Sequence, residues 1–175
     1  SLALERDAML ELMRGDTCRN LINIFFLQER AKKRTLSPVE TKPVARTAVI
    51  GAGVMGAGIA HWISARQLPV ILRDIGTAQV AHGMADIAKL YRDGVKHRRL
   101  TALEARAGLE RVQPAPEEVP LRHADIVIEA AVENLELKKK IFQRLDELVA
   151  DDAILATNTS ALPVSELAAA TRHPG

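Results

Sequence analysis

The sequence predicts an α/β fold: a doubly wound parallel sheet, preceded by a short N-terminal helical segment. Two observations predict it. From Thr47 onward, short apolar runs alternate with longer stretches in which apolar residues recur every three or four positions. This alternation is typical of βαβ units, whose strands are parallel and whose crossovers are right-handed. In addition, the first apolar run leads directly into a glycine-rich turn and then into a helical pattern.

The composition bounds the class of protein. The chain has 175 residues, 47% of them apolar and 26% charged, which is ordinary for one globular domain with an appendage. A net charge of +2, with one Trp and one Tyr, argues against a nucleic-acid surface. No apolar run is long enough for a transmembrane segment. Cys18 is the single cysteine, so we expect no disulfide framework and no metal site.

Residues 1–34 are predicted to form the helical segment. Gly15 is expected to stop a first helix, and Asp16 to cap a second one. The apolar face of the second helix comprises Leu21, Ile22, Ile24, Phe25, Phe26 and Leu27. The basic cluster from Arg30 to Arg34 then indicates a solvated helix end. Residues 35–46 contain two prolines and are predicted to be a linker to a nucleotide-binding domain over 47–175.

The elements of that domain follow from the apolar pattern. Strands are expected near residues 47–51, 69–73, 125–130 and 153–157, with a further short one near 111–114. Helices are expected near residues 54–66, 77–98, 101–110, 136–149 and 163–170. The chain therefore predicts four to five strands connected by helices on both faces of the sheet.

The glycine-rich turn is the first candidate site. Gly51, Gly53 and Gly56 form a GxGxxG pattern between a strand and a helix, which is the context that gives this pattern its meaning. The first glycine permits a tight turn, the second lets the backbone approach a pyrophosphate, and the third lets the helix pack on the strand. Three glycines in a turn without a ligand are the alternative. The flanking strand and helix favour dinucleotide binding on a Rossmann-like fold.

Asp74 closes the second predicted strand at the spacing expected for an acidic ribose ligand. A carboxylate there accepts hydrogen bonds from ribose hydroxyls and repels a 2′-phosphate. Two charges about 4 Å apart cost on the order of 4 kcal/mol at an effective dielectric of 20. NAD is therefore favoured over NADP. Arg73 would soften this preference if it faced the same way, but strand alternation favours the opposite direction.

Two further polar segments leave alternatives open. Lys138, Lys139 and Lys140 lie in the first turns of a helix, against its dipole. Pairing with Glu136 would explain Lys140 as part of a solvated face, but it leaves Lys138 without an evident partner. The segment 158–160 follows the last strand. It forms either a ligand site or a turn that caps the helix after Pro163.

Taken together, four segments resemble the NAD-binding domain of the L-3-hydroxyacyl-CoA dehydrogenases. They are VIGAGVMGAGIA (49–60), Asp74, VIEAAVENLELKKKIFQRLDE (127–147) and ATNTSALPVSELA (156–168). Residues 1–46, through RNLINIFFLQERAKK, are similar to the segment that joins the enoyl-CoA hydratase/isomerase half to the dehydrogenase half in multifunctional fatty-acid β-oxidation proteins of the bacterial α-subunit type. The resemblance implies oxidation of an L-3-hydroxyacyl-CoA to a 3-oxoacyl-CoA, with NAD as the cofactor.

The resemblance also implies a role for each matching residue. The pyrophosphate would be held by Gly51, Gly53, Val54, Met55 and Gly56, and the adenosine ribose by Asp74. The nicotinamide ribose would lie beside Glu133 and Lys138, with the backbone of Ala131 and Val132 against it. Ser160 would contact the nicotinamide and the substrate, and it is the one residue of this chain predicted to lie in the catalytic part of the site.

In the family, a catalytic His in a motif resembling HFFNP follows the NTS segment, and its Glu partner comes later. Both are expected beyond Gly175, so the chain is interpreted as a piece cut at both ends that binds NAD without turnover. His173 is expected to be a loop residue. The basic residues Lys89, Lys96, Arg98 and Arg99 indicate either a CoA phosphate contact or a solvated helix end.

Several implications concern the whole protein. They are an acyl-CoA substrate, a thiolase partner, the lyase and isomerase activities of the other half, and a bacterial cytoplasmic location. The alternatives are an NAD-dependent dehydrogenase of another short 3-hydroxy acid and a non-catalytic NAD-binding relative.

Overall fold

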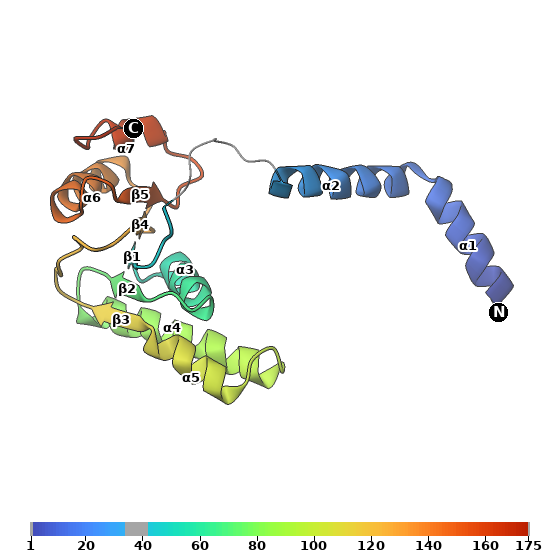
Figure 1. Ribbon diagram of the computed structural model, residues 1–175, viewed down its shortest axis with the longest axis horizontal. Helices are drawn as coiled ribbons and strands as arrows, with labels where there is room; N and C mark the ends of the chain where they lie inside the picture. The colour runs from blue at the N-terminus through green and yellow to red at the C-terminus, as the bar shows by residue number, and fades with distance from the viewer. Residues whose placement is uncertain (1, 34–41, 175) are drawn as a thin grey trace. The chain divides into compact units, whose positions relative to one another are not determined.

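The computed structural model describes residues 2–33 and 42–174, which lie in two compact units, Ser1–Lys42 and Pro43–Gly175 (Figure 1). Most of the linker predicted over residues 35–46 lies outside the described residues.

The first unit consists of two helices, α1 (Leu2–Arg14) and α2 (Asp16–Lys33). The predicted break at Gly15 is confirmed, and its N–H donates to the carbonyl of Leu12 at 3.2 Å. The predicted cap is wrong: Asp16 is the first residue of α2 and its carboxylate pairs with Arg19 in the first turn at 3.2 Å. The apolar side chains of α2 are exposed, Phe25 by 56% and Phe26 by 54%. No described residue of this unit covers them.

The second unit is built on five parallel strands in the order β3-β2-β1-β4-β5. They are β1 (Thr47–Ile50), β2 (Val70–Arg73), β3 (Val112–Ala115), β4 (Ile126–Glu129) and β5 (Ile154–Thr157). In the register, Thr47 lies opposite Val70 on one side and Ile126 on the other. From β1, the chain adds β2 and β3 on one side, then returns to place β4 and β5 on the other side of β1. The predicted fold class is confirmed, with its switch point between β1 and β4.

Helices cover both faces of the sheet. On one face, α3 (Val54–Ala65), α4 (Thr77–Lys96) and α5 (Ala102–Glu110) pack on a core that includes Val49 and Leu72. On the other, α6 (Leu135–Leu148) packs on a core that includes Ala48 and Val127, and α7 (Val164–Ala168) lies against α6 (Figure 1). Successive residues of β1 thus point into opposite cores, as the pleat requires.

A polar contact is buried between α3 and α4. The hydroxyls of Ser64 and Tyr91 lie 2.7 Å apart, and the Tyr91 ring packs edge-on against the imidazole of His61 at 4.5 Å between centroids. Nε2 of His61 is buried and has no hydrogen-bond partner among the described residues. Burial accordingly lowers the pKa of His61. The buried environment between α3 and α4 therefore favours the neutral form of the His61 imidazole.

Candidate nucleotide site at the carboxyl ends of the strands

A cavity of about 510 Å³ opens at the carboxyl ends of β1, β2 and β4. Its walls come from the turn after β1, the end of β2, the loop after β4 and one side of α6 from Leu137 to Leu145. The lining includes Gly51, Gly53, Asp74, Val132 and Lys140. Ligands in open α/β sheets bind where the strand order reverses, which is the position of this cavity.

The three glycines of the turn differ in what a side chain would meet. Gly51 has φ +106°, and a Cβ there would lie 2.6 Å from the carbonyl oxygen of Ala130. A Cβ on Gly56 would lie 1.7 Å from the carbonyl oxygen of Gly51. A Cβ on Gly53 would meet no atom within 4 Å. Gly51 and Gly56 are therefore required by the fold, whereas Gly53 faces open space that a ligand can fill.

The N-terminus of α3 points its backbone donors toward that space. Gly53 is the N-cap of the helix and supplies no side-chain hydrogen bond, so the first N–H groups lack a cap. The next two side chains, of Val54 and Met55, are 81% and 57% exposed. Free N–H groups and the positive end of the helix dipole favour an anion such as a pyrophosphate. The residues present thus fit a dinucleotide.

Asp74 ties the end of β2 to the glycine turn. Its Oδ2 accepts a hydrogen bond from the N–H of Ala52 at 2.6 Å, and its Oδ1 accepts one from the N–H of Ile75 at 2.7 Å. A carboxylate oxygen has two lone pairs, so each oxygen keeps one for a ribose hydroxyl.

Arg73 and Asp74 both line the cavity, and their side chains have different partners: Asp74 accepts the Ala52 N–H, whereas Arg73 pairs with Glu118. The Arg73 guanidinium lies 3.4 Å from the carboxylate of Glu118, which offsets its charge.

The lysines at the start of α6 differ in their partners. Glu136 pairs with Lys139 at 3.4 Å, so the predicted pairing with Lys140 is wrong. Lys139 also reaches Glu166 of α7 at 2.9 Å. Lys140 lines the cavity beside the glycine turn.

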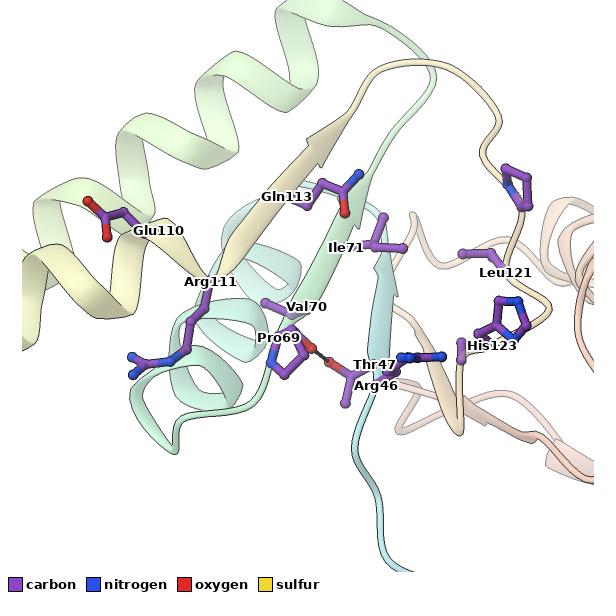
Figure 2. Close-up of a pocket in the computed structure, with 12 residues that line it drawn as sticks. Arg46, Thr47, Pro69, Val70, Ile71, Glu110, Arg111, Gln113, Leu121 and His123 are labelled. Atoms are coloured by element: carbon purple, nitrogen blue, oxygen red, sulfur yellow. Dashed lines mark hydrogen bonds between the residues drawn. The ribbon is translucent and has the colours of Figure 1, made fainter.

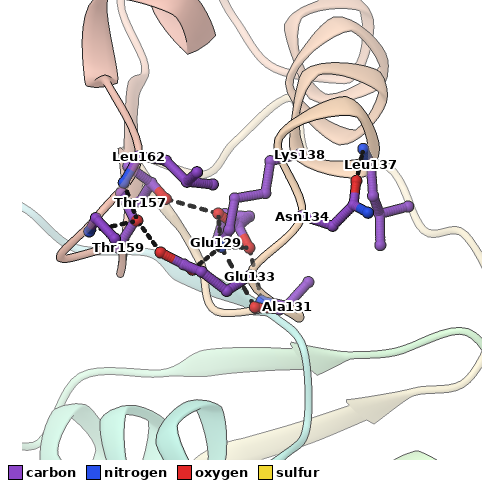
Figure 3. Close-up of polar contacts among 10 residues, drawn as sticks. Glu129, Ala131, Glu133, Asn134, Leu137, Lys138, Thr157, Thr159 and Leu162 are labelled. Atoms are coloured by element: carbon purple, nitrogen blue, oxygen red, sulfur yellow. Dashed lines mark hydrogen bonds and ion pairs between the residues drawn. The ribbon is translucent and has the colours of Figure 1, made fainter.

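Lys138 is wholly buried and is paired with a residue that the sequence reading missed. Its Nζ lies 2.8 Å from both carboxylate oxygens of Glu129, whose side chain is also 0% exposed (Figure 3). Glu129 ends β4, and its carboxylate accepts further bonds from the Ala131 N–H and the Thr157 hydroxyl, each at 2.6 Å. The sequence signal was a single carboxylate closing an otherwise apolar strand. Its partner lies nine residues away.

Glu133 and the turn after β5 meet beside this pair (Figure 3). The Thr159 hydroxyl donates to Glu133, and the Lys138 ammonium lies 3.4 Å from the same carboxylate. The hydrogen bond from Thr159, with a smaller contribution from Lys138, lowers the pKa of Glu133 below its ordinary value. Thr159 Oγ1 also accepts from the N–H of Leu162 at 3.1 Å.

The segment 158–160 does not cap the helix that follows Pro163. The N-cap of α7 is Pro163, and α7 has no side-chain cap bond. Ser160 lies exposed on the turn, next to Thr159.

A second cavity, of about 500 Å³, lies at the amino-terminal half of the sheet (Figure 2). It is bordered by Thr47, Ile71 and Gln113 on the strands and by Leu121 and His123 on the loop before β4. The Thr47 hydroxyl there donates to the carbonyl of Pro69 at 2.8 Å. This cavity has neither a glycine turn nor a helix N-terminus, so the first cavity is the candidate nucleotide site.

The remaining predicted residues lie outside both cavities. His173 is 60% exposed and lies 3.8 Å from Asp151, as expected for a loop residue. The basic residues of the α4 end, Lys89, Lys96, Arg98 and Arg99, are exposed. Residues 2–33 and 42–174 contain no group of three or more side chains suited to a metal ion. In the same ranges, no helix is long and apolar enough to cross a bilayer.

Known proteins share this arrangement. Residues 46–175 match the sequence profile described as "3-hydroxyacyl-CoA dehydrogenase, NAD binding domain". The solved structure of M. tuberculosis FadB2 is 34% identical, with a TM-score of 0.74 over 76% of this chain and 47% of that one. The 3-hydroxybutyryl-CoA dehydrogenase of Escherichia coli K12 is 36% identical, with a TM-score of 0.73 over 76% of this chain and 28% of that one. The (S)-3-hydroxybutyryl-CoA dehydrogenase PaaH1 of Ralstonia eutropha is 36% identical, with a TM-score of 0.73 over 75% of this chain and 47% of that one. The chain therefore spans less than half the length of each relative.

Proposed function

The chain belongs to the family of 3-hydroxyacyl-CoA dehydrogenase NAD-binding domains, and from that premise we propose that it is the NAD-holding part of an enzyme that oxidises L-3-hydroxyacyl-CoA to 3-oxoacyl-CoA. When bound, NAD supplies the acceptor for the hydride that leaves C3 of the substrate. The hydroxyl proton must go to a general base. By resemblance that base is a histidine outside residues 1–175, so this chain supplies binding and orientation.

One observation carries the proposal: a carboxylate and an open glycine turn are joined at the switch point of the sheet. Asp74 accepts the Ala52 N–H at 2.6 Å, which holds the ribose-binding carboxylate against the pyrophosphate-binding turn. Gly53 leaves open space over the N-terminus of α3. The carboxylate matches the ribose of an adenosine diphosphate, and the turn matches its two phosphates.

The individual contacts are proposals as well. Gly51, Gly53, Val54, Met55 and Gly56 would face the pyrophosphate, and Asp74 the adenosine ribose. Ala131, Val132, Glu133, Lys138 and Ser160 would serve the nicotinamide half. The pairing of Glu133 with Lys138 and Thr159 keeps it ionised, so that it can accept a hydrogen bond from a ribose hydroxyl.

The first unit supports a multifunctional parent. Apolar side chains of α1 and α2 are exposed, among them Leu4 by 72% and Leu21 by 62%. A helix with apolar residues around its circumference is normally buried against other protein. We therefore propose that residues 1–34 close a preceding hydratase/isomerase-like domain and that 35–46 link it to the NAD-binding domain. From the resemblance to multifunctional β-oxidation proteins, we further propose a β-oxidation role with lyase and isomerase activities in the parent, a thiolase partner and a bacterial cytoplasmic location.

Calorimetric titration of the chain with NAD, NADH and NADP tests the proposal. NAD and NADH should bind, and NADP should bind at least tenfold more weakly because Asp74 repels its 2′-phosphate. In Asp74→Asn, the affinity for NAD should fall and the difference between NAD and NADP should narrow. Asp93→Asn, an exposed change on α4, is the matched control and should bind as the unaltered chain does. A chain that melts cooperatively but binds none of the three nucleotides contradicts the proposal.

A further inference from the structure

We infer that Glu118, on the loop between β3 and β4, is a second determinant of cofactor specificity, which disfavours NADP by engaging two arginines of the cavity beside Asp74. This inference rests on the proposed function, because it concerns the choice between NAD and NADP at the same site. Glu118 is not among the residues that line the cavity. It is therefore a positioning residue that acts through Arg73 and Arg144.

The charges that line the cavity do not by themselves exclude the 2′-phosphate of NADP. Besides the carboxylate of Asp74, the lining contains the cationic side chains of Arg73, Lys140 and Arg144. On folds of this type, an arginine near the end of the second strand can accommodate that phosphate. The planar guanidinium is also well suited to binding phosphate oxygens. Repulsion from Asp74 is thus opposed by cations close to it, unless these are engaged elsewhere.

Glu118 engages both of the guanidinium groups. Arg144 donates to its two carboxylate oxygens, from Nε to Oε2 at 3.0 Å and from Nη2 to Oε1. Nη2 of Arg73 lies 3.4 Å from the same Oε2. The hydrogen bonds from Arg144, with a smaller contribution from Arg73, lower the pKa of Glu118 below its ordinary value. The carboxylate therefore stays ionised at neutral pH and offsets part of the positive charge of the cavity.

These ion pairs are too exposed for folding stability to be their main effect. The side chains of Arg73, Glu118 and Arg144 are 21%, 35% and 51% exposed. Pairs with this much access to water contribute little to stability, because solvent screens the charges and ordering the side chains costs entropy. Their effect on a ligand is more direct, since N–H groups that already donate to a carboxylate are not free for a phosphate.

Calorimetric titration with NAD and NADP tests the inference, with a thermal melt of each variant. Glu118→Gln keeps the size of the side chain and removes its charge. The double variant E118Q/R73Q also removes the guanidinium that the first change releases. The matched control is Glu147→Gln, because Glu147 is the other carboxylate paired with Arg144 and its substitution changes the net charge equally.

Glu118→Gln should raise the ratio of NADP affinity to NAD affinity at least fivefold, because Arg73 becomes free to pair with the 2′-phosphate. The double variant should lose most of that gain, and the control should keep the ratio of the unaltered chain within twofold.

Three results overturn the inference. They are an unchanged ratio in Glu118→Gln, a gain that persists in the double variant, and an equal gain in Glu147→Gln, which would reflect net charge alone. In each case, binding of NAD by the unaltered chain upholds the proposed function. If the unaltered chain binds neither nucleotide, the proposed function is overturned together with the inference.

Discussion

The three glycines of the turn lead to a prediction that separates folding from binding. We expect Gly53→Ala to weaken NAD binding at least tenfold, which corresponds to about 1.4 kcal/mol, without loss of stability. A Cβ at this position meets no protein atom within 4 Å, and the backbone at φ −68° and ψ −174° suits any residue. The new methyl group instead occupies the space into which a pyrophosphate must come to reach the helix N-terminus.

The stability terms for Gly53→Ala nearly cancel. Alanine is a poorer N-cap than glycine by up to about 1 kcal/mol. Removing a glycine from the unfolded chain returns about 0.4–1 kcal/mol. The melting temperature should therefore change by no more than about 2–4 °C, the shift that about 1 kcal/mol produces in a chain of this size.

Two other glycines of the same helix calibrate the result. Gly56→Ala would place a Cβ 1.7 Å from a backbone oxygen, so α3 must move, at a cost of about 1–3 kcal/mol or more. At Gly58, by contrast, a Cβ also meets nothing within 4 Å. Gly58→Ala should stabilise the helix by about 0.5–1 kcal/mol and leave binding unchanged.

The assay is calorimetric titration with NAD beside a thermal melt of each variant. If Gly53→Ala binds NAD as tightly as the unaltered chain, the open space at Gly53 is not the pyrophosphate site. If Gly58→Ala loses affinity equally, the loss is not specific to the turn. Either result refutes the reasoning from the glycine geometry.

Three further predictions concern stability. Burial lowers the pKa of His61, so the stability that the neutral imidazole contributes is present above the unfolded-state pKa and is lost as pH falls below about 6.5. Between pH 7 and 5, the melting temperature should therefore decline less in His61→Phe than in the unaltered chain. An equal decline would contradict this. Thr101→Ala should lower stability by about 1 kcal/mol, because it removes the capping box that begins α5, and an unchanged urea midpoint would exclude that role. Burial raises the pKa of Asp146, but hydrogen bonds from Arg172 outweigh it and leave the pKa below its ordinary value. That contribution is present above the unfolded-state pKa and is lost as pH falls through the folded one, so acid titration of Arg172→Gln should show unfolding at higher pH.

The local pattern of the sequence was enough to predict most of the second unit. The alternation of apolar runs and the glycine turn predicted every strand to within one or two residues, from β1 at Thr47–Ile50 to β5 at Ile154–Thr157. Parallel strands and short connections restrict the possible topologies, which is why the fold class followed as well. The break at Gly15 was predicted for the same local reason.

Side-chain pairings could not be predicted from the local pattern of the sequence. Helix spacing offered Lys140 as the partner of Glu136, whereas the partner in the structure is Lys139. In a helix, both the third and the fourth residue along the chain come within reach of a side chain, so spacing alone does not choose between Lys139 and Lys140.

The sheet, the glycine turn and the acidic residue at the end of β2 could be predicted from the sequence, because each depends on neighbours along the chain. The pairing of Lys138 with Glu129 and the closeness of Glu133 to Thr159 were decided by the tertiary structure alone. These contacts arise because parallel strands bring their carboxyl ends to one edge, where residues far apart in sequence become neighbours. Burial then decides their chemistry, since a charge withdrawn from water must find its partner within the protein.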